Sequence, residues 1–381
     1  MSAPTNEAAL ADVVKSAKGP LAIKGGGTRG VAVEGAALSV AGLSGSTRYE
    51  PGARTLVAQA GTPIAEIEAA LAAENQRLAF EPMDPRALLG TAGEPTLGGV
   101  IAANVSGPRR IQGGAARDYA LGVRFVDGTG EVVKNGGRVM KNVTGYDLVK
   151  LMCGAYGTLG VLTEISLKVL PTPETQGTLL VRGLDDKRAV EAMAAAMSSP
   201  FEVTGAAHCA TIMEDGPVTA LRIEGFESSV SYRLGQLKNL LARFDAEMTI
   251  GDSAMSEWVW RSVRDAELLR DVPEDVWRVS CKPSEAPALM QRSGAVGWYF
   301  DWAGGRIWVR MPEGQDLRAA LGTYDGHATL VRGSAKTRAV LPMFEPEAAG
   351  VAKISAGLRA RFDPRGILNR GLMGPVAEEV V

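Results

Sequence analysis

The stretch that decides the fold is LGTAGEPTLGGVIAANVSG, residues 89–107. Small residues dominate it, and the Gly98-Gly99 pair lets a ligand approach the backbone closely. Short hydrogen-bonding residues and a further glycine surround this pair: Thr96, Asn104, Ser106 and Gly107. The combination suits a flat aromatic ring system with a phosphate tail. A glycine-rich surface loop is the alternative, but Leu97 and Ile101 make the stretch too apolar for a solvated linker.

A second glycine-rich stretch, GGGTRG at 25–30, follows a short strand predicted at 21–24. It satisfies the G-x-G-x-x-G spacing, but a nicotinamide dinucleotide fold needs a helix directly after it. The following residues, VAVEG at 31–35, favour a strand instead. An anion nest of converging backbone N–H groups needs no helix. Thr28 could add a hydroxyl donor to it and Lys24 or Arg29 a positive charge, while a plain tight turn stays open as the alternative.

A third stretch, GAYGTLGVLTEI at 154–165, runs from a glycine-rich turn into a buried strand. Around these stretches the chain alternates short elements. Thr62 as N-cap and Pro63 as first residue predict a helix start. Residues 120–133 predict a hairpin around Asp127-Gly128. The prolines at 171 and 173 mark the best domain boundary.

Beyond that boundary the pattern of strands and helices occurs twice. The first set of predicted elements covers 178–182, 186–198, 202–210, 218–224, 228–244 and 246–250. The second set covers 276–282, 284–292, 297–302, 306–311, 315–321 and 327–332. Each set is strand, helix, two strands, helix, strand. Two such βαββαβ units predict one antiparallel sheet with helices on one face, and a last helix is predicted from Ala348 to Phe362.

Taken in chain order, the three glycine-rich stretches (25–30, 89–107 and 154–165) resemble the FAD-binding domain of the vanillyl-alcohol oxidase type, also called the PCMH type. Further stretches of that family follow in order: RDYALG (117–122), KNVTGYDL (141–148), GTLGVLTE (157–164) and FDPRGILN (362–369). The resemblance implies an α+β protein. Its parts would be a PCMH-type FAD-binding domain (1–172), an α+β cap domain with an antiparallel sheet covered by helices (173–335), and a C-terminal segment returning to the FAD domain (336–381).

The resemblance also implies where FAD is held. The expected cofactor-binding residues are Gly25, Gly26, Gly27, Thr28, Pro82, Gly93, Thr96, Leu97, Gly98, Gly99, Asn104, Ser106, Gly107, Gly160, Val161 and Asn369. Arg109 and Arg110 follow the flavin-lining stretch, so a contact with a substrate carboxylate or a partner is expected of them. A solvated turn is the alternative for these two arginines.

A closer resemblance covers nearly the whole chain. SGPRR (106–110), VWRVS (276–280), FDWAGGRIWVR (300–310) and GHATLVRG (326–333) are similar to the smaller FAD-binding subunits of bacterial glycolate oxidases. That family implies oxidation of glycolate to glyoxylate, with electrons passed through flavin, and two partners: a larger FAD-binding subunit and an iron–sulfur subunit. The alternatives are a stand-alone FAD-dependent 2-hydroxy-acid dehydrogenase and a non-catalytic structural or electron-relay subunit.

Histidine scarcity limits the chemistry. The chain has two histidines, His208 and His327, whereas related single-chain dehydrogenases carry a histidine-rich, metal-linked site. A structural role is favoured for each, no metal is expected, and no catalytic residue is assigned. Because residues 1–172 contain no histidine, we expect FAD to be bound non-covalently. Cys153 lies in an apolar context and is interpreted as a packed thiol.

Composition excludes other classes. A net charge of −2 argues against a nucleic-acid binder. No window of about 18 apolar residues occurs, so no transmembrane segment is expected. The first residues lack the pattern of a signal peptide. Three cysteines without ligand spacing favour a reducing compartment. We therefore expect a cytoplasmic protein, associated with the inner membrane, if at all, through partner subunits.

Overall fold

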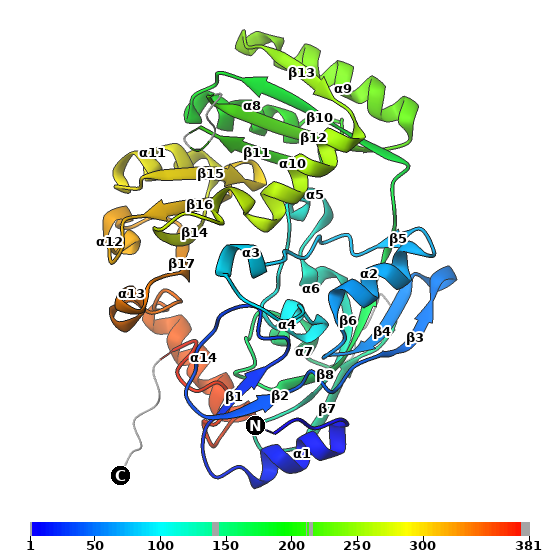
Figure 1. Cartoon of the computed structure of the whole chain (residues 1–381), viewed down its shortest axis with the longest axis vertical. Helices are drawn as coiled ribbons and strands as arrows, with labels where there is room; N and C mark the ends of the chain where they lie inside the picture. The colour runs from blue at the N-terminus through cyan, green and yellow to red at the C-terminus, as the bar shows by residue number, and fades with distance from the viewer. Residues whose placement is uncertain (1, 139–144, 211, 213–215, 375–381) are drawn as a thin grey trace. The chain divides into compact units, whose positions relative to one another are not determined.

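The structure is a computed structural model that describes residues 2–138, 145–210, 212 and 216–374. Its contacts divide the chain into two compact units (Figure 1). The first unit consists of Met1–Ser106, Gly114–Thr172 and Pro346–Val381, and the second of Gly107–Gly113 and Pro173–Glu345. The second unit thus includes 107–113 and 336–345, which the sequence analysis assigns to other parts. Residues 141–144 of the KNVTGYDL stretch lie outside the described residues.

The first unit contains short helices and strands. The helices are α1 (Glu7–Ser16), α2 (Ile64–Ala72), α3 (Arg86–Leu89), α4 (Leu97–Ala102), α6 (Ala116–Tyr119), α7 (Leu148–Met152) and α14 (Ala349–Phe362). The strands are β1 (Leu21–Lys24), β2 (Ala36–Ser39), β3 (Ser46–Glu50), β4 (Thr55–Gln59), β5 (Gln76–Arg77), β6 (Ala120–Val126), β7 (Val132–Gly136), β8 (Val161–Lys168) and β9 (Leu170–Pro171).

An antiparallel sheet with the order β3-β4-β8-β6-β7 forms the larger layer of this unit. Its apolar side chains pack with α2, α4, α6 and α7 around residues such as Ile67, Phe125 and Ile165, none of which is exposed. The predicted hairpin is confirmed, because β6 and β7 pair antiparallel. In its turn, Asp127 Oδ1 accepts hydrogen bonds from the amides of Thr129 (2.8 Å) and Glu131 (3.0 Å).

A second, smaller layer joins the start and the end of the chain. Strands β1 and β2 pair in parallel, and α1 packs beside them. The amide of Leu21 donates to the carbonyl of Ile367 (2.7 Å), and Ile367 and Leu368 complete the apolar cluster around Leu10 and Leu38. No strand forms at residues 31–34, contrary to the sequence pattern, since the pairing partner of β1 begins only at Ala36.

The second unit is an α+β layer structure. Its strands are β10 (Thr175–Arg182), β11 (Gly205–Cys209), β12 (Val218–Gly225), β13 (Met248–Gly251), β14 (Asp275–Cys281), β15 (Gly297–Asp301), β16 (Arg306–Met311) and β17 (Gly326–Arg332). Its helices are α5 (Arg110–Gly113), α8 (Asp186–Met197), α9 (Glu227–Leu241), α10 (Ser253–Asp265), α11 (Ala286–Arg292), α12 (Leu317–Leu321) and α13 (Ala335–Val340). The expected α+β class with an antiparallel sheet is confirmed.

The eight strands form one sheet with the order β13-β10-β12-β11-β15-β16-β14-β17. Numbered within each set of four, the order is 4-1-3-2 followed by 2-3-1-4, so the two halves mirror each other across the β11–β15 pair. Helices α8, α9, α11 and α12 share one hydrophobic core with alternate strand residues such as Leu179, Phe300 and Ile307. We call this face of the sheet the helix face.

The expectation that helices cover only one face is wrong. Leu179 belongs to the helix face, so its neighbour Thr178 points to the opposite face. There the Thr178 hydroxyl is hydrogen-bonded to Ser256 (2.7 Å) and to Trp260 Nε1 (2.9 Å), both on α10. Helix α10 therefore covers part of the second face of the sheet. It does so through polar contacts, which the spacing of apolar residues in the sequence does not predict.

Candidate functional site

The first unit contains a cavity of about 350 Å³. Most of its lining residues come from three segments that are far apart in the sequence, at 23–32, 95–103 and 156–162. Each is one of the glycine-rich stretches or its continuation, and the volume is within the range of small-molecule sites. The fold thus brings the three stretches to one place.

Ten of the residues expected to bind the cofactor line this cavity. They are Gly25, Gly26, Gly27, Thr28, Thr96, Gly98, Gly99, Gly160, Val161 and Asn369. The others lie elsewhere: Pro82, Gly93, Leu97, Asn104, Ser106 and Gly107 are not among the lining residues that the structure describes. Further lining residues were not singled out as cofactor-binding: Ile23, Val40, Tyr156, Leu162 and Leu372.

The loop at 25–28 is shaped by direct backbone packing. A Cβ on Gly26 would overlap the carbonyl of Glu94, and a Cβ on Gly93 would overlap the carbonyl of Gly26. Gly27 has a φ of +72°, in the left-handed region that favours glycine. Gly93 therefore packs against the backbone of the loop and does not line the cavity.

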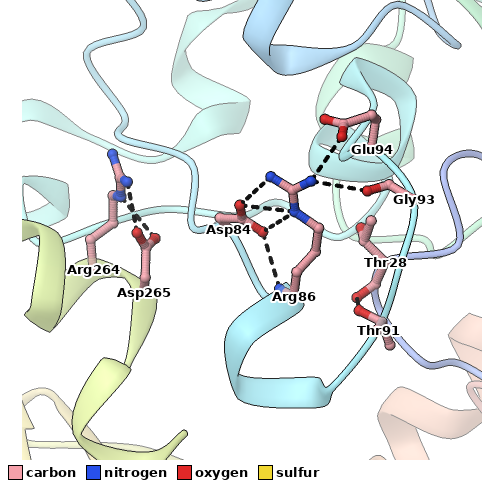
Figure 2. Close-up of polar contacts among 8 residues, drawn as sticks. All are labelled: Thr28, Asp84, Arg86, Thr91, Gly93, Glu94, Arg264 and Asp265. Carbon is pink, nitrogen blue, oxygen red and sulfur yellow. Dashed lines mark hydrogen bonds and ion pairs between the residues drawn. The ribbon is translucent and has the colours of Figure 1, made fainter.

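Arg86 fixes the segment that this loop packs against (Figure 2). Its guanidinium donates to Asp84 (2.8 Å), to Glu94 (2.9 Å) and to the carbonyl of Gly93 (3.1 Å). The Asp84 carboxylate raises the pKa of Arg86 above its ordinary value through this hydrogen bond. Thr91 adds a link to the loop itself by donating to the carbonyl of Thr28 (2.7 Å). A planar five-donor guanidinium can hold such a turn where a lysine could not.

The charge of the cavity lining is positive. Lys24 and Arg29 line it, and no carboxylate occurs among the lining residues that the structure describes. Arg29 Nε also donates to the carbonyl of Gly99 (3.3 Å), which links the loop to α4. Apolar walls are supplied by Ile23, Val100, Val161 and Leu372. A ligand that combines an anionic group with a flat apolar group fits this lining.

Asn369, in the C-terminal segment, forms hydrogen bonds with two of the segments that line the cavity. Its Oδ1 accepts from the amide of Ile23 (2.8 Å), and its Nδ2 donates to the carbonyl of Tyr156 (2.8 Å). Tyr156 has a φ of +51° within the GAYG turn, which the sequence analysis did mark as glycine-rich. Leu372 gave no signal of its own, because it lines the cavity only through the return of the chain.

The remaining expected residues of the first unit lie outside the cavity lining that the structure describes. Pro82 and Leu97 are buried. Asn104 Oδ1 accepts from the amide of Arg117 (3.1 Å), and Ser106 Oγ accepts from the amide of Ala116 (3.1 Å). These two side chains therefore anchor the N-terminus of α6.

Gly107, Arg109 and Arg110 belong to the second unit. The carbonyl of Gly107 accepts from Trp302 Nε1 (2.9 Å), and the guanidinium of Arg110 lies 4.9 Å from the centroid of the same ring. Arg109 is 5% exposed and forms a buried ion pair with Glu224. The structure thus places Arg109 in the interior of its unit.

The two histidines have different surroundings. His208 lies on the helix face of the second unit, is 1% exposed, and is hydrogen-bonded through Nδ1 to Thr219 (2.9 Å). Its Nε2 lies 3.4 Å from Asp186 Oδ1. His327 is on β17 and exposed. Partial burial lowers the pKa of His327, and the charge of Arg278 lowers it further.

Cys153 is buried in the core of the first unit, where burial raises the pKa of its thiol to about 12. Neither a cysteine nor a histidine occurs among the cavity-lining residues that the structure describes. No group of three or more metal-ligating side chains was found in the described part of the chain. A search of the described helices for one long and apolar enough to cross a membrane found none.

Comparison with known proteins agrees with this geometry. Residues 1–136 match the family model described as an FAD binding domain. The chain is 34% identical over 363 residues to the glycolate oxidase subunit GlcE of Escherichia coli, covering 94% of this chain and 93% of that protein. It is 42% identical over 101 residues to the glycolate oxidase subunit GlcD of Bacillus subtilis, covering 26% of this chain and 21% of that protein.

Solved structures show the same fold at low identity. An alkyldihydroxyacetonephosphate synthase aligns with a TM-score of 0.67 at 16% identity, covering 97% of this chain and 76% of that one. The p-cresol methylhydroxylase aligns with a TM-score of 0.67 at 12% identity, covering 98% of this chain and 88% of that one. These structures confirm the expected PCMH-type fold, and the match to the FAD-binding family model together with the similarity to GlcE confirms FAD as the cofactor. The chain belongs to the family of the glycolate oxidase subunit GlcE.

Proposed function

We propose that this chain is the FAD-binding subunit of a multi-subunit glycolate oxidase, in which glycolate is oxidised to glyoxylate. The cavity of the first unit carries the proposal, because it combines glycine backbone, two cationic side chains and apolar walls. This lining suits a dinucleotide with a flat ring system. The similarity to GlcE over nearly the whole chain supports the same reading.

In this proposal the first unit is the FAD-binding domain and the second is the cap domain. The Gly25–Gly27 backbone, the Thr28 hydroxyl, Lys24 and Arg29 hold the pyrophosphate. Gly98, Gly99, Gly160 and Val161 approach the ring system, and Asn369 keeps the walls in place. When bound, FAD supplies a two-electron acceptor for the hydroxy acid.

The proposed partners are a larger FAD-binding subunit and an iron–sulfur subunit that receives the electrons. The names of the glycolate oxidase subunits that the chain resembles support a multi-subunit complex, and the nature of its two partners is part of the proposal. A cytoplasmic location, with membrane contact only through partner subunits, belongs to the same proposal. The alternative of a non-catalytic relay subunit is favoured by the scarcity of histidine.

Anaerobic addition of glycolate to the purified, flavin-loaded chain tests the proposal. Bleaching of the flavin absorbance by the chain alone supports oxidation by this subunit and excludes a pure relay role. Bleaching only after addition of the partner subunits supports the relay role and excludes a stand-alone dehydrogenase. Absence of flavin from both the free chain and the assembled complex contradicts the proposal as a whole. D-Lactate, tested in parallel, reports whether another hydroxy acid is preferred.

A further inference from the structure

Helix α14 of the first unit is less covered than the other long helices. Among the helices of eight or more residues in the described part of the chain, it is the only one without a buried residue. Leu358 and Phe362, near its C-terminal end, are half-buried and pack against the core of the first unit. The turns before them carry Val351 and Ile354, which are 53% and 67% exposed. The N-terminal part of α14 thus presents apolar side chains to solvent.

The sequence of α14 does not explain why these exposed turns are helical. The N-cap residue, Ala348, makes no side-chain capping hydrogen bond, and the first turn contains no acidic residue. The helix includes Gly350 and Gly357, and a Cβ at either position would meet nothing within 4 Å. Glycine is the least favourable helix residue after proline, and most helical stability in proteins comes from packing. Packing against another molecule would supply the stabilisation that these turns lack.

The exposed side of these turns is basic. Lys353 and Arg361 are exposed, and no Asp or Glu occurs between 348 and 362. Glu347 lies just before the helix, and its carboxylate accepts from the Ser355 hydroxyl (2.8 Å). At 3.6 residues per turn, Ser355 lies about 160° around the helix from Lys353. The acidic residue nearest in sequence therefore binds on the side of the helix away from Lys353.

The exposed apolar and basic residues form one continuous surface. Residues seven positions apart lie on the same side of a helix, since seven residues make about two turns. Ile354 therefore shares a side with Arg361, and Val351 continues the side on which Leu358 packs against the core. Lys353 lies next to Ile354 in sequence. We call Val351, Lys353, Ile354 and Arg361 the α14 surface.

Two other occupants suit this surface poorly. In a two-fold dimer the same surface meets itself, so Lys353 and Arg361 would face like charges. A helix that lies in a lipid surface buries a whole apolar side. In α14, Leu358 and Phe362 already pack against the core of their own unit.

We propose that the α14 surface is the docking site for a partner subunit whose contacting surface is apolar at its centre and carries carboxylates around it. The inference rests on the multi-subunit part of the proposed function and adds to it the place on this chain where a partner binds. The similarity of the chain to a glycolate oxidase subunit supports the need for such a place. Val351 and Ile354 become buried in the contact, and Lys353 and Arg361 pair with the carboxylates.

Hydrogen exchange tests whether a partner covers the helix. The purified chain is compared with its complex with the larger FAD-binding subunit and the iron–sulfur subunit. In the purified chain the amides of residues 350–357 should exchange rapidly, and in the complex at least about tenfold more slowly. Slow exchange in the purified chain would show that the chain itself covers the helix, which overturns the proposal. Equally rapid exchange in an assembled complex overturns the docking site and leaves the proposed function standing.

Substitutions test which residues of the surface bind. Ile354→Ser, and Lys353→Glu combined with Arg361→Glu, should each raise the Kd for the partner subunits about tenfold or more, with FAD content and circular dichroism unchanged. Matched controls on α9 are Tyr232→Ser and Lys238→Glu, which also change an exposed apolar and an exposed basic residue. Both controls should bind like the wild type. Wild-type binding by the α14 variants, or equal weakening by the controls, contradicts the proposal.

The same variants identify a different occupant. Sedimentation equilibrium of the purified chain reports a second copy, and cosedimentation with vesicles of phosphatidylcholine and phosphatidylserine reports a lipid surface. Self-association or vesicle binding that Ile354→Ser abolishes assigns the surface to that occupant and overturns the proposal. If the wild-type chain binds neither partner subunit, the multi-subunit part of the proposed function fails, and the docking site fails with it.

Discussion

Gly26 shows how one missing side chain determines the shape of the proposed phosphate loop. Its backbone lies against Glu94, and the neighbouring Gly93 lies against Gly26 in return. These two backbone segments are too close for a Cβ between them. The loop can therefore follow this path only with glycine at positions 26 and 93. Arg86 in turn donates hydrogen bonds to the Glu94 carboxylate and to the carbonyl of Gly93 (Figure 2).

Gly26→Ala is therefore expected to displace the loop. Overpacking of this kind costs about 1–3 kcal/mol in the free energy of unfolding, and FAD binding should be lost with it. Urea unfolding and an FAD titration measure the two effects. Gly52→Ala is the matched control, because a Cβ there meets nothing within 4 Å. It should change stability by less than about 0.5 kcal/mol. Wild-type FAD affinity in Gly26→Ala would show that the loop does not contact the cofactor.

The cysteines should be unreactive in the folded chain. Burial raises the pKa of Cys153 and of Cys281 to about 12 each, and Cys209 is buried. At pH 8 about 10⁻⁴ of a thiol with that pKa is thiolate, and the thiolate is the reacting form. A thiol reagent should label the native chain slowly, faster as pH rises, and all three cysteines at once in denaturant. Rapid labelling of a thiol at pH 8 in the native chain would contradict the burial of these groups.

Two threonines illustrate what local sequence rules predict at this scale. Thr62 was predicted to cap a helix, but Pro63 is the N-cap of α2, and the Thr62 hydroxyl accepts instead from the amide of Gly45 (3.0 Å). Thr96 does cap a helix, since it accepts from the amide of Gly99 (3.4 Å) at the start of α4. A capping rule considers only neighbours in sequence, and Gly45 is 17 residues away.

At the scale of elements, the C-terminal segment holds together the end of α1 and the β6–β7 hairpin. Arg365 donates to the carbonyls of Val14 (2.6 Å), Lys15 (3.2 Å) and Ala17 (3.2 Å) at the end of α1, where the last carbonyls lack partners further along the helix. The same guanidinium donates to the carbonyl of Gly128 in the hairpin loop (2.7 Å). One side chain thus stabilises two elements that lie far from it in sequence.

Arg365→Lys should lower the free energy of unfolding by about 1–2 kcal/mol, because an ammonium cannot reach all four carbonyls. Hydrogen exchange should increase at the end of α1 and in the hairpin loop. Arg270→Lys is the control, since its exposed guanidinium pairs with the neighbouring Asp271 (2.9 Å), a contact that an ammonium can also make. Equal losses of stability in both variants would mean that the multiple contacts of Arg365 add nothing.

The sheet of the second unit could be predicted from the sequence strand by strand, because alternation of apolar residues is a local signal. The sheet face that α10 covers could not be predicted in this way. Its placement depends on the contacts of Thr178 with Ser256 and Trp260, residues 78 and 82 positions away. In the first unit the glycine-rich stretches were visible, whereas the short paired strands β5 and β9 were not.

At the scale of the whole molecule, each unit has a core of its own. The apolar cluster around Leu179 and Trp277 contains residues of the second unit, and the clusters around Phe125 and Leu38 contain residues of the first. The sequence placed a boundary near the prolines at 171 and 173. It gave no reason to group residues 107–113 with the later chain, because the partners of Arg109 and Gly107 are Glu224 and Trp302.

We expect FAD to stabilise the first unit selectively. A ligand present at 100 times its Kd adds about 2.7 kcal/mol to the stability of the unit that binds it. All six tryptophans lie between residues 258 and 308, so tryptophan fluorescence reports the unfolding of the second unit alone. Release of flavin reports the first. With increasing FAD, the flavin-release midpoint in a thermal melt should rise by several degrees, while the tryptophan midpoint stays constant. Equal shifts of both midpoints would show instead that the two cores unfold as one cooperative unit.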